Sequence, residues 1–552
     1  MHSKLGLMCS ALVGASLLAL DPTTAQSLSD SEKIERLQRQ TEQLQKQLKA
    51  LQEEIALTKK KTEKVEAAQA KEAAPAGHAA PTPDRDPTKS PIAKAPAWTD
   101  KVKVTLGGFV TADTVFRARN QVNDTGTSFT AIPYPFSPLY GEHEFHGSAR
   151  QSRLSVLAEG NIDPVQKLAA YWESDFMGVA TNSNYTETNS WALRVRNAYL
   201  TYDNTAWGFH LLAGQSWSLL TQNTVGITPR KENIPLTIDA DYVDGFNYTR
   251  GWQIRLVQDF GQKVWLGVSV ETPATIDNNV PGGATTVNGL EINAINTGTS
   301  GFLQGVAVTP DHVPDVIEKV AFDPGWGHYE LFGIERWFSD NTFCQFSAPT
   351  GCAVGMTSLK TAFGAAVGGS VLLPLIPKYL DAQASVMYGR GIGRYGAGQL
   401  PDVTIAADGS LAPVTVLQTM VGLVGHPWES LDVYAYGGLE QANAKFFNGV
   451  GTMPIATAFG YGNPAFDNRG CNITTATSFA GLAPTPLMCV ANNRRLIDGT
   501  IGFWYNLYRG PLGRLATGAE YEYIRREAFN GIGGAPSTAN HVVLTSLRYY
   551  PF

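Results

Sequence analysis

Four arginines and two acidic residues stand at alternate positions of otherwise apolar stretches. These charged residues are Arg153, Arg194, Arg196, Arg255, Glu173 and Asp175. A guanidinium group stays charged at every physiological pH and binds carboxylates through two parallel hydrogen bonds. A surface that presents all four would bind anions. The two acidic residues would add a transverse field across that surface, or the opposite charges would only neutralise one another.

The stretches that carry these charges are predicted to be β-strands, because their apolar residues recur at every second position. Arg194 and Arg196, for example, alternate with Leu193 and Val195. In a strand the two sets point to opposite faces. An arginine that faces the centre of a bilayer costs about 2 to 4 kcal/mol, so in a membrane barrel the arginines are expected to face the lumen.

The strands are arranged in hairpins, each a strand, a very short turn and a strand, followed by a long polar connection. Seven short turns are expected near residues 163–164, 203–204, 261–262, 324–325, 374–377, 426–427 and 510–511. An opening strand near residues 102–115 and a closing strand at 541–552 bring the total to sixteen. Because lipid offers no partner to an unpaired strand edge, the sheet is predicted to close into a sixteen-stranded antiparallel barrel. A large soluble sandwich or propeller is the alternative.

The first hundred residues have a different composition. Residues 1–25 place Lys4 before an apolar run from Leu5 to Leu20, and small or hydroxylated residues lead to a cleavage site at Ala25, which predicts a signal peptide. Residues 27–65 carry a heptad seam that predicts a coiled coil, with a frayed solvated helix as the alternative. Residues 66–97 are rich in Pro and Ala and predict a linker. The barrel is assigned to residues 98–552, and no later window is apolar enough for a membrane helix.

Four cysteines remain after the predicted signal peptide, namely Cys344, Cys352, Cys471 and Cys489. Three pairings are possible, and pairing within each close pair is expected because each brackets one loop; a metal site is the rival interpretation. The long connection from Ser218 to Thr249 either folds inward and narrows the lumen or lies outside the barrel.

Composition and motifs exclude several functions. The net charge of −6 argues against binding to nucleic acid. The sequence lacks the serine-elbow, phosphate-loop and zinc-protease motifs, so no enzyme and no cofactor are predicted. His143, Glu144 and His146 form no expected metal site, because strand residues three apart point to opposite faces.

The chain resembles the DcaP-like family of trimeric outer-membrane channels. The resemblance rests on the order of its parts and on Val104-Thr-Leu-Gly-Gly-Phe-Val110, Arg150-Gln-Ser-Arg-Leu-Ser-Val156, Leu193-Arg-Val-Arg-Asn-Ala-Tyr199, Gly214-Gln-Ser-Trp217 and Leu547-Arg-Tyr-Tyr-Pro-Phe552. It implies a homotrimer that takes up small anionic solutes such as dicarboxylates, with arginines at the constriction. Pro551 departs from the usual terminal pattern, because proline removes a donor from the strand pairing.

These features together predict a porin in the outer membrane of a Gram-negative bacterium, in contact with outer-membrane lipid and with a periplasmic N-terminal stalk. The alternative is an envelope tether or adhesin that is anchored by the barrel and works through the coiled coil. The residues at the heptad seam do not decide between two and three subunits.

Overall fold

The computed structural model describes residues 101–178, 191–277, 286–287, 290–292, 311–344, 357–406, 410–450, 456–473 and 489–552. The predicted signal peptide (1–25), coiled coil (27–65) and linker (66–97) lie outside the described residues, and so does Cys352. The predictions for these parts therefore stay predictions.

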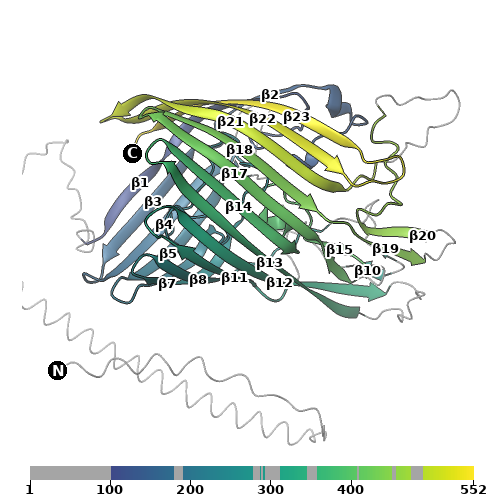
Figure 1. Ribbon diagram of the computed structural model, residues 1–552, viewed down its shortest axis with the longest axis horizontal. Helices are drawn as coiled ribbons and strands as arrows, with labels where there is room; N and C mark the ends of the chain where they lie inside the picture. The colour runs from purple at the N-terminus through teal and green to yellow at the C-terminus, as the bar shows by residue number, and fades with distance from the viewer. Residues whose placement is uncertain are drawn as a thin grey trace, which may run out of the picture. The chain divides into compact units, whose positions relative to one another are not determined.

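Sixteen long strands of the described chain form one closed antiparallel barrel (Figure 1). They are β1 (Lys103–Arg117), β3 (Arg153–Asn161), β4 (Gln166–Gly178), β5 (Ala192–Asn204), β6 (Phe209–Trp217), β7 (Arg250–Phe260), β8 (Val264–Glu271), β11 (Asp315–Phe322), β12 (His328–Cys344), β13 (Thr357–Ile376), β14 (Leu380–Arg390), β17 (Thr415–Trp428), β18 (Leu431–Ala442), β21 (Asn493–Gly510), β22 (Gly513–Ala528) and β23 (Ser537–Tyr550). The barrel closes because β1 pairs with β3 through its first half and with β23 through its second half. The sixteen-stranded barrel predicted from the sequence is confirmed.

All seven predicted hairpins are present, with small shifts of the turns. The β5–β6 turn lies at 205–208, because Asn204 still pairs with Phe209. The β17–β18 turn lies at 429–430, and the pairing shifts register between Gly425 and Trp428, where Pro427 cannot donate. Strands thus extend as far as their pairing allows, and these two turns lie two and three positions later than the sequence predicted.

The two faces of each strand differ as the alternation predicts. On β8, Leu266 and Val268 point outward and are 44% and 39% exposed, whereas Trp265 and Ser269 point inward and are buried. Exposed aromatic residues gather at the short-turn end of the barrel, with Trp207, Trp326, Tyr379 and Trp428 in or beside four different turns. Such girdles are typical of the two membrane interfaces of a barrel. No described helix is long and apolar enough to span a bilayer.

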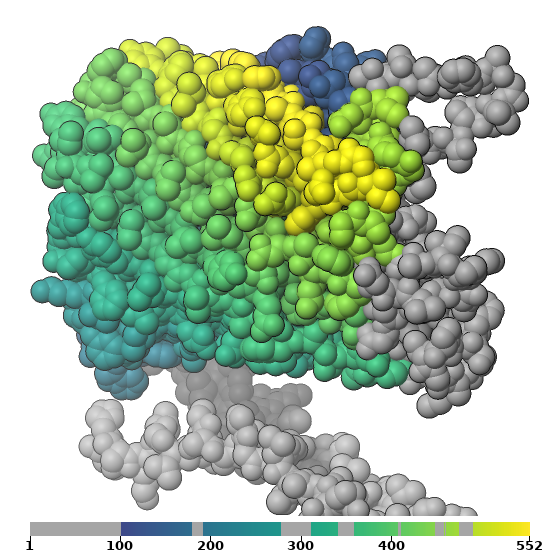
Figure 2. Space-filling model, turned by 45° about the vertical axis from the view of Figure 1, so that its right-hand side comes forward, coloured from purple at the N-terminus to yellow at the C-terminus, as the bar shows by residue number. Residues whose placement is uncertain are grey.

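Short strands lie in the long connections between the barrel strands, and the sequence did not predict them. They are β2 (Glu144–Ser148), which pairs with β1, together with β9 (Thr286–Val287), β10 (Leu290–Ile292), β15 (Val403–Ile405), β16 (Leu411–Pro413), β19 (Lys445–Val450) and β20 (Ala456–Tyr461). The C-terminal strands β21, β22 and β23 pair side by side, and β23 pairs with β1, which closes the wall. On the face shown in Figure 2, C-terminal residues (yellow) accordingly lie beside residues from the start of the barrel (blue). The main cluster of buried apolar residues lies inside the barrel rather than between layers.

Candidate pore and its charged lining

The connection between β6 and β7, residues 218–249, folds into the lumen; we call it the inward segment. Its backbone N–H groups donate hydrogen bonds to inward carboxylates on several strands. These are Leu219 to Glu271 at 2.8 Å, Asn223 to Glu330 at 2.9 Å, Ile238 and Asp239 to Glu520 at 2.8 and 2.9 Å, and Gly245 to Glu440 at 3.0 Å. Of the two possibilities that the sequence left open for this connection, the structure has the inward one.

A second segment, residues 391–406, fills the lumen beside β11, β12 and β14. The buried Arg336 forms ion pairs with Asp315 at 3.1 Å and with Asp402 of this segment at 2.7 Å. The Tyr395 hydroxyl donates to Asp315 at 2.7 Å, and the Tyr248 N–H donates to the Tyr395 carbonyl at 3.1 Å. The two segments are thus joined to each other and to the wall, and this side of the lumen is packed.

Open space lies on the other side of the inward segment. A cavity of about 410 Å³ separates residues 234–242 from the wall. Its charged and aromatic lining residues are Phe109, Arg153, Glu173, Asp175, Arg196, Asp239, Tyr242, Asp432, Trp504, Arg514, Arg548 and Tyr550. A second cavity of about 230 Å³ adjoins it and shares Arg153, Glu173, Arg196, Ile234 and Tyr242. A path along the wall formed by β1, β3–β5 and β21–β23 therefore runs beside the inward segment.

Four of the six predicted charges form one ion-pair network. Arg196 donates to Glu173 at 2.8 Å and to Asp175 at 3.0 Å, and Arg194 donates to Asp175 at 2.9 and 2.7 Å. The Arg196 side chain is 4% exposed, while that of Arg194 is 30% exposed. Much of the positive charge of Arg196 is thus balanced inside the wall.

A bulge in β5 places Arg196 in this network. Asn197 pairs with Glu173 and Val195 pairs with Ser174, so Arg196 has no partner opposite it and points inward together with Asn197. The carbonyl oxygens left by the bulge accept hydrogen bonds from the Gln215 side chain on β6, at 2.9 Å from Val195 and 3.3 Å from Arg196. An extra strand residue of this kind re-aims neighbouring side chains.

The remaining two predicted arginines differ from each other. Arg153 lines both cavities, its side chain is 26% exposed, and its nearest carboxylate is Glu173 at 3.9 Å. Arg255 is 2% exposed and donates to the Gln253 side chain at 3.0 Å and to the Trp217 carbonyl at 2.6 Å. It lines neither cavity, and its guanidinium is held at the end of β6, directly before the inward segment begins.

Two arginines of the C-terminal strands line the larger cavity and were missed in the sequence. Arg548 lies 4.5 Å from the centre of the Trp504 ring and donates to the Gln151 side chain at 3.2 Å. Arg514 lies 3.9 Å from the centre of the Tyr550 ring. Among the described residues, no ion pair joins either guanidinium to a carboxylate. Arg548 alternates with the outward Leu547 and Tyr549, so the period-2 pattern of the closing strand contained this signal.

The inward segment carries titratable groups of its own. Burial and the neighbouring Asp239 raise the pKa of Asp241 to about 7, and Arg194 opposes that rise. Burial also raises the pKa of Asp244 well above its usual value, and Glu440 and Asp498 add to the rise. The Arg196 guanidinium holds the pKa of Tyr242 below its usual value in spite of burial. The charge of this segment therefore changes near neutral pH.

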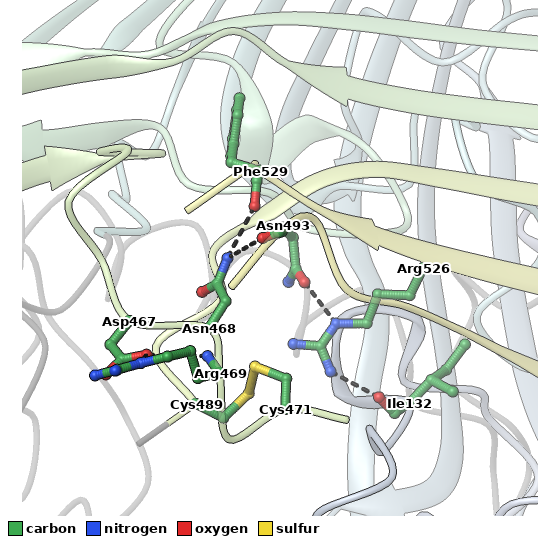
Figure 3. Close-up of a disulfide and its surroundings, with 10 residues drawn as sticks. Ile132, Asp467, Asn468, Arg469, Cys471, Cys489, Asn493, Arg526 and Phe529 are labelled. Carbon is green, nitrogen blue, oxygen red and sulfur yellow. Dashed lines mark hydrogen bonds and ion pairs between the residues drawn. A yellow bond between two sulfur atoms is a disulfide. The ribbon is translucent and has the colours of Figure 1, made fainter. Parts of the chain in front are cut away.

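Beyond the lumen, Cys471 and Cys489 form a disulfide that closes a loop of the long-loop end (Figure 3). The carbonyl of Cys471 accepts a hydrogen bond from the Phe136 N–H at 3.2 Å. Arg526 donates to the Ile132 carbonyl at 2.7 Å and fixes residues 129–136 to β22. No group of three or more possible ligands in the described part of the chain is placed to hold a metal ion.

A closed barrel of sixteen antiparallel strands, with one long connection folded inside, defines the porin-like class of fold. The crystal structure of the outer membrane channel DcaP of Acinetobacter baumannii has this fold, with a TM-score of 0.53, 18% identity, and coverage of 82% of this chain and 98% of that one. The resemblance predicted from the sequence is thus confirmed for the fold.

Two further solved structures are similar at lower scores. The anion-selective porin from Comamonas acidovorans has a TM-score of 0.41 and 11% identity, and the match covers 82% of this chain and 100% of the porin chain. OprB of Pseudomonas putida has a TM-score of 0.41 and 10% identity, and the match covers 82% of this chain and 95% of the OprB chain. No protein-family model and no curated protein matches the sequence.

Proposed function

We propose that the chain is an outer-membrane porin through which small anionic organic solutes, such as dicarboxylates, diffuse passively. The observation that carries this proposal is the basic face of the larger cavity, formed by Arg153, Arg514 and Arg548. Guanidinium groups that are not closely paired raise the local concentration of anions. They bind the carboxylate of one solute and release it for the next without a covalent step. No catalytic chemistry is proposed.

The opposite face of the cavity suits a solute with a short apolar body. Ile234, Pro235 and Leu236 of the inward segment line this face. The Leu236 carbonyl accepts a hydrogen bond from the Trp504 indole at 2.7 Å, so these residues are held against the wall. A dicarboxylate would place its carboxylates on the arginines and its methylene groups on the apolar face. The acidic pair Glu173 and Asp175 would orient it from one side.

The same proposal includes the parts that lie outside the described residues. It assigns residues 1–25 to a signal peptide, 27–65 to a periplasmic coiled-coil stalk, 66–97 to a linker and the assembly to a homotrimer. The tether or adhesin is the other candidate, and it rests on the heptad seam. Deletion of residues 27–97 separates the two, because a porin keeps its conductance without the stalk whereas a tether loses its role.

The test is the zero-current potential of the purified protein in planar bilayers under a salt gradient. We expect stepwise, anion-selective conductance that succinate reduces. Arg153→Gln and Arg548→Gln should each lower the anion-to-cation permeability ratio about twofold or more, because each removes one charge from the cavity. Arg390→Gln is the matched control, since Arg390 is exposed at the long-loop end of β14. Cation selectivity that the variants leave unchanged would refute the anion proposal, and absence of conductance would refute the channel.

A further inference from the structure

A groove of about 350 Å³ lies on the outer surface of the barrel near the long-loop end, where β22 and β23 meet the chain after β1. It is lined by Ala118, Arg119, Tyr140, His143, Tyr523, Arg525, Ser537, Thr538, Ala539 and His541. None of these lining residues is acidic. The groove lies outside the wall and has no part in the path beside the inward segment.

The outward residues of β22 show the level at which the groove lies. From the short-turn end, Leu515, Thr517 and Ala519 are followed by Tyr521, Tyr523 and then Arg525. The two tyrosines are 37% and 38% exposed, so they face away from the lumen. Aromatic side chains mark the edge of the hydrocarbon region, and arginine is placed beyond it. The groove therefore lies at the height of lipid headgroups.

The neighbouring strand continues this boundary. His541 pairs with Tyr523 across β22 and β23, and its Nδ1 lies 2.8 Å from the Tyr521 hydroxyl oxygen. On the other side of the groove, Arg119 stacks at 3.7 Å over the Tyr140 ring and donates to the Tyr140 carbonyl at 2.8 Å. Arg119 is thus held in place by the loop and lines the groove.

The charge around the groove is positive. Arg525 forms an ion pair with Glu527 at 2.9 Å, but Glu527 also faces Arg495 on β21 at 3.6 Å. One carboxylate is thus shared by two arginines, and Arg119 adds a third cation. His143 is flanked in the sequence by Glu142, which is exposed, and by Glu144, which is buried and paired with Arg117. The imidazole rings of His143 and His541 also line the groove.

We propose that this groove binds a phosphate group of a phosphorylated glycolipid in the outer leaflet of the membrane. Arg119 and Arg525 approach the phosphate from two sides, the hydroxyl groups of Ser537 and Tyr523 donate to it, and the acyl chains lie along the apolar outward face of β22 and β23. Arginine suits this role because its planar group binds phosphate oxygens in pairs. The inference rests on the outer-membrane location proposed above.

The test is native mass spectrometry of the full chain in detergent, titrated with lipid A that carries its phosphates. We expect the Arg119→Gln/Arg525→Gln variant to bind this lipid about tenfold or more weakly than the unsubstituted chain, because it loses two charge-assisted contacts. Arg390→Gln again serves as the control, since it removes an exposed arginine elsewhere on the same rim. Resistance of the folded barrel to unfolding in cold detergent shows that each variant is intact. Conductance is measured separately, so a failure of lipid binding is distinguishable from a failure of the porin proposal.

Five outcomes would overturn the inference. Equal binding of the lipid by the double variant removes the groove as its site. Equal loss in Arg390→Gln shows a general effect of surface charge. Equal binding of dephosphorylated lipid A would show that the groove does not recognise the phosphate group. If millimolar inorganic phosphate alone displaces the lipid, the groove is a site for the free ion. A double variant that changes its number of subunits shows that the groove is covered by a second copy of the chain.

Discussion

Arg196 is predicted to stabilise the barrel much more strongly than Arg548, although both are arginines of the lumen. Arg196 lies within 2.8 and 3.0 Å of carboxylate oxygens of Glu173 and Asp175, and all three side chains are nearly buried. At an effective dielectric constant of about 20, each of these contacts gives about 5 kcal/mol of attraction before the cost of desolvation. Removal of one partner of a buried pair costs about 3 to 5 kcal/mol, because it leaves an uncompensated charge.

The assay is urea unfolding of Arg196→Gln and Arg548→Gln, followed by tryptophan fluorescence in detergent micelles. We expect Arg196→Gln to lower the free energy of unfolding by about 3 to 5 kcal/mol. Arg548→Gln should change it by about 1 kcal/mol or less, because Arg548 is half-buried and forms no ion pair with a described carboxylate. The reasoning fails if the two variants unfold at the same urea concentration.

A double variant shows whether the carboxylate is the cause. In the single variant Arg196→Gln, the Glu173 carboxylate loses its close partner. The double variant Glu173→Gln/Arg196→Gln removes this carboxylate charge as well. We expect the double variant to be less destabilised than the sum of the two single variants, with a coupling energy of about 0.5 to 3 kcal/mol. Additive losses would show that Arg196 acts through its packing and its contact with Tyr242 instead.

Three other perturbations have expected outcomes. Since the pKa of Asp241 is raised to about 7, this carboxyl is neutral below that pH and charged above it. Anion selectivity measured in bilayers should therefore fall as the pH rises from 6 to 8. The Asp241→Asn variant should abolish this change. Glu520→Gln weakens the acceptor of two N–H groups of the inward segment, so single-channel conductance should rise and become noisier; unchanged conductance would show that the segment needs no such anchor. Cys471→Ser opens a disulfide that closes a separation of 18 residues, worth about 3 kcal/mol; limited proteolysis should then cut this loop faster while conductance stays the same, and unchanged cleavage would contradict this.

The barrel was predictable from the sequence because one physical requirement acts on every strand. Lipid demands apolar residues on one face and the lumen admits polar ones, so a period of two persists over the whole sheet. Short turns and long connections then give the number of strands. Pairing between strands carries no comparable signal, which is why the turns expected at 203–204 and at 426–427 were misplaced by a few residues.

The site was predictable only in part. The alternation identified inward arginines, but it did not indicate which of them lie beside a carboxylate. That depends on register, and the β5 bulge that brings Arg196 to Glu173 is stabilised by Gln215 of the next strand. Arg514 and Arg548 were missed because the alternation was followed only in the early strands. Arg255 is buried because of the course that the inward segment takes. The length of this connection in the sequence did not indicate that course.

The anchoring of the inward segment explains how a chain with a net charge of −6 presents a cavity with one basic face. Glu271, Glu330, Glu440 and Glu520 point into the barrel, yet each accepts backbone N–H groups of the inward segment, and none of them lines the larger cavity. The acidic residues are therefore used to hold the segment against one side of the wall. Arg153, Arg514 and Arg548 remain on the other side. Among the described carboxylates, that of Glu173 forms an ion pair with Arg153 at 3.9 Å, and none forms one with Arg514 or Arg548. Net charge thus describes the whole chain, whereas the field that a solute meets depends on which carboxylates already accept hydrogen bonds from the backbone.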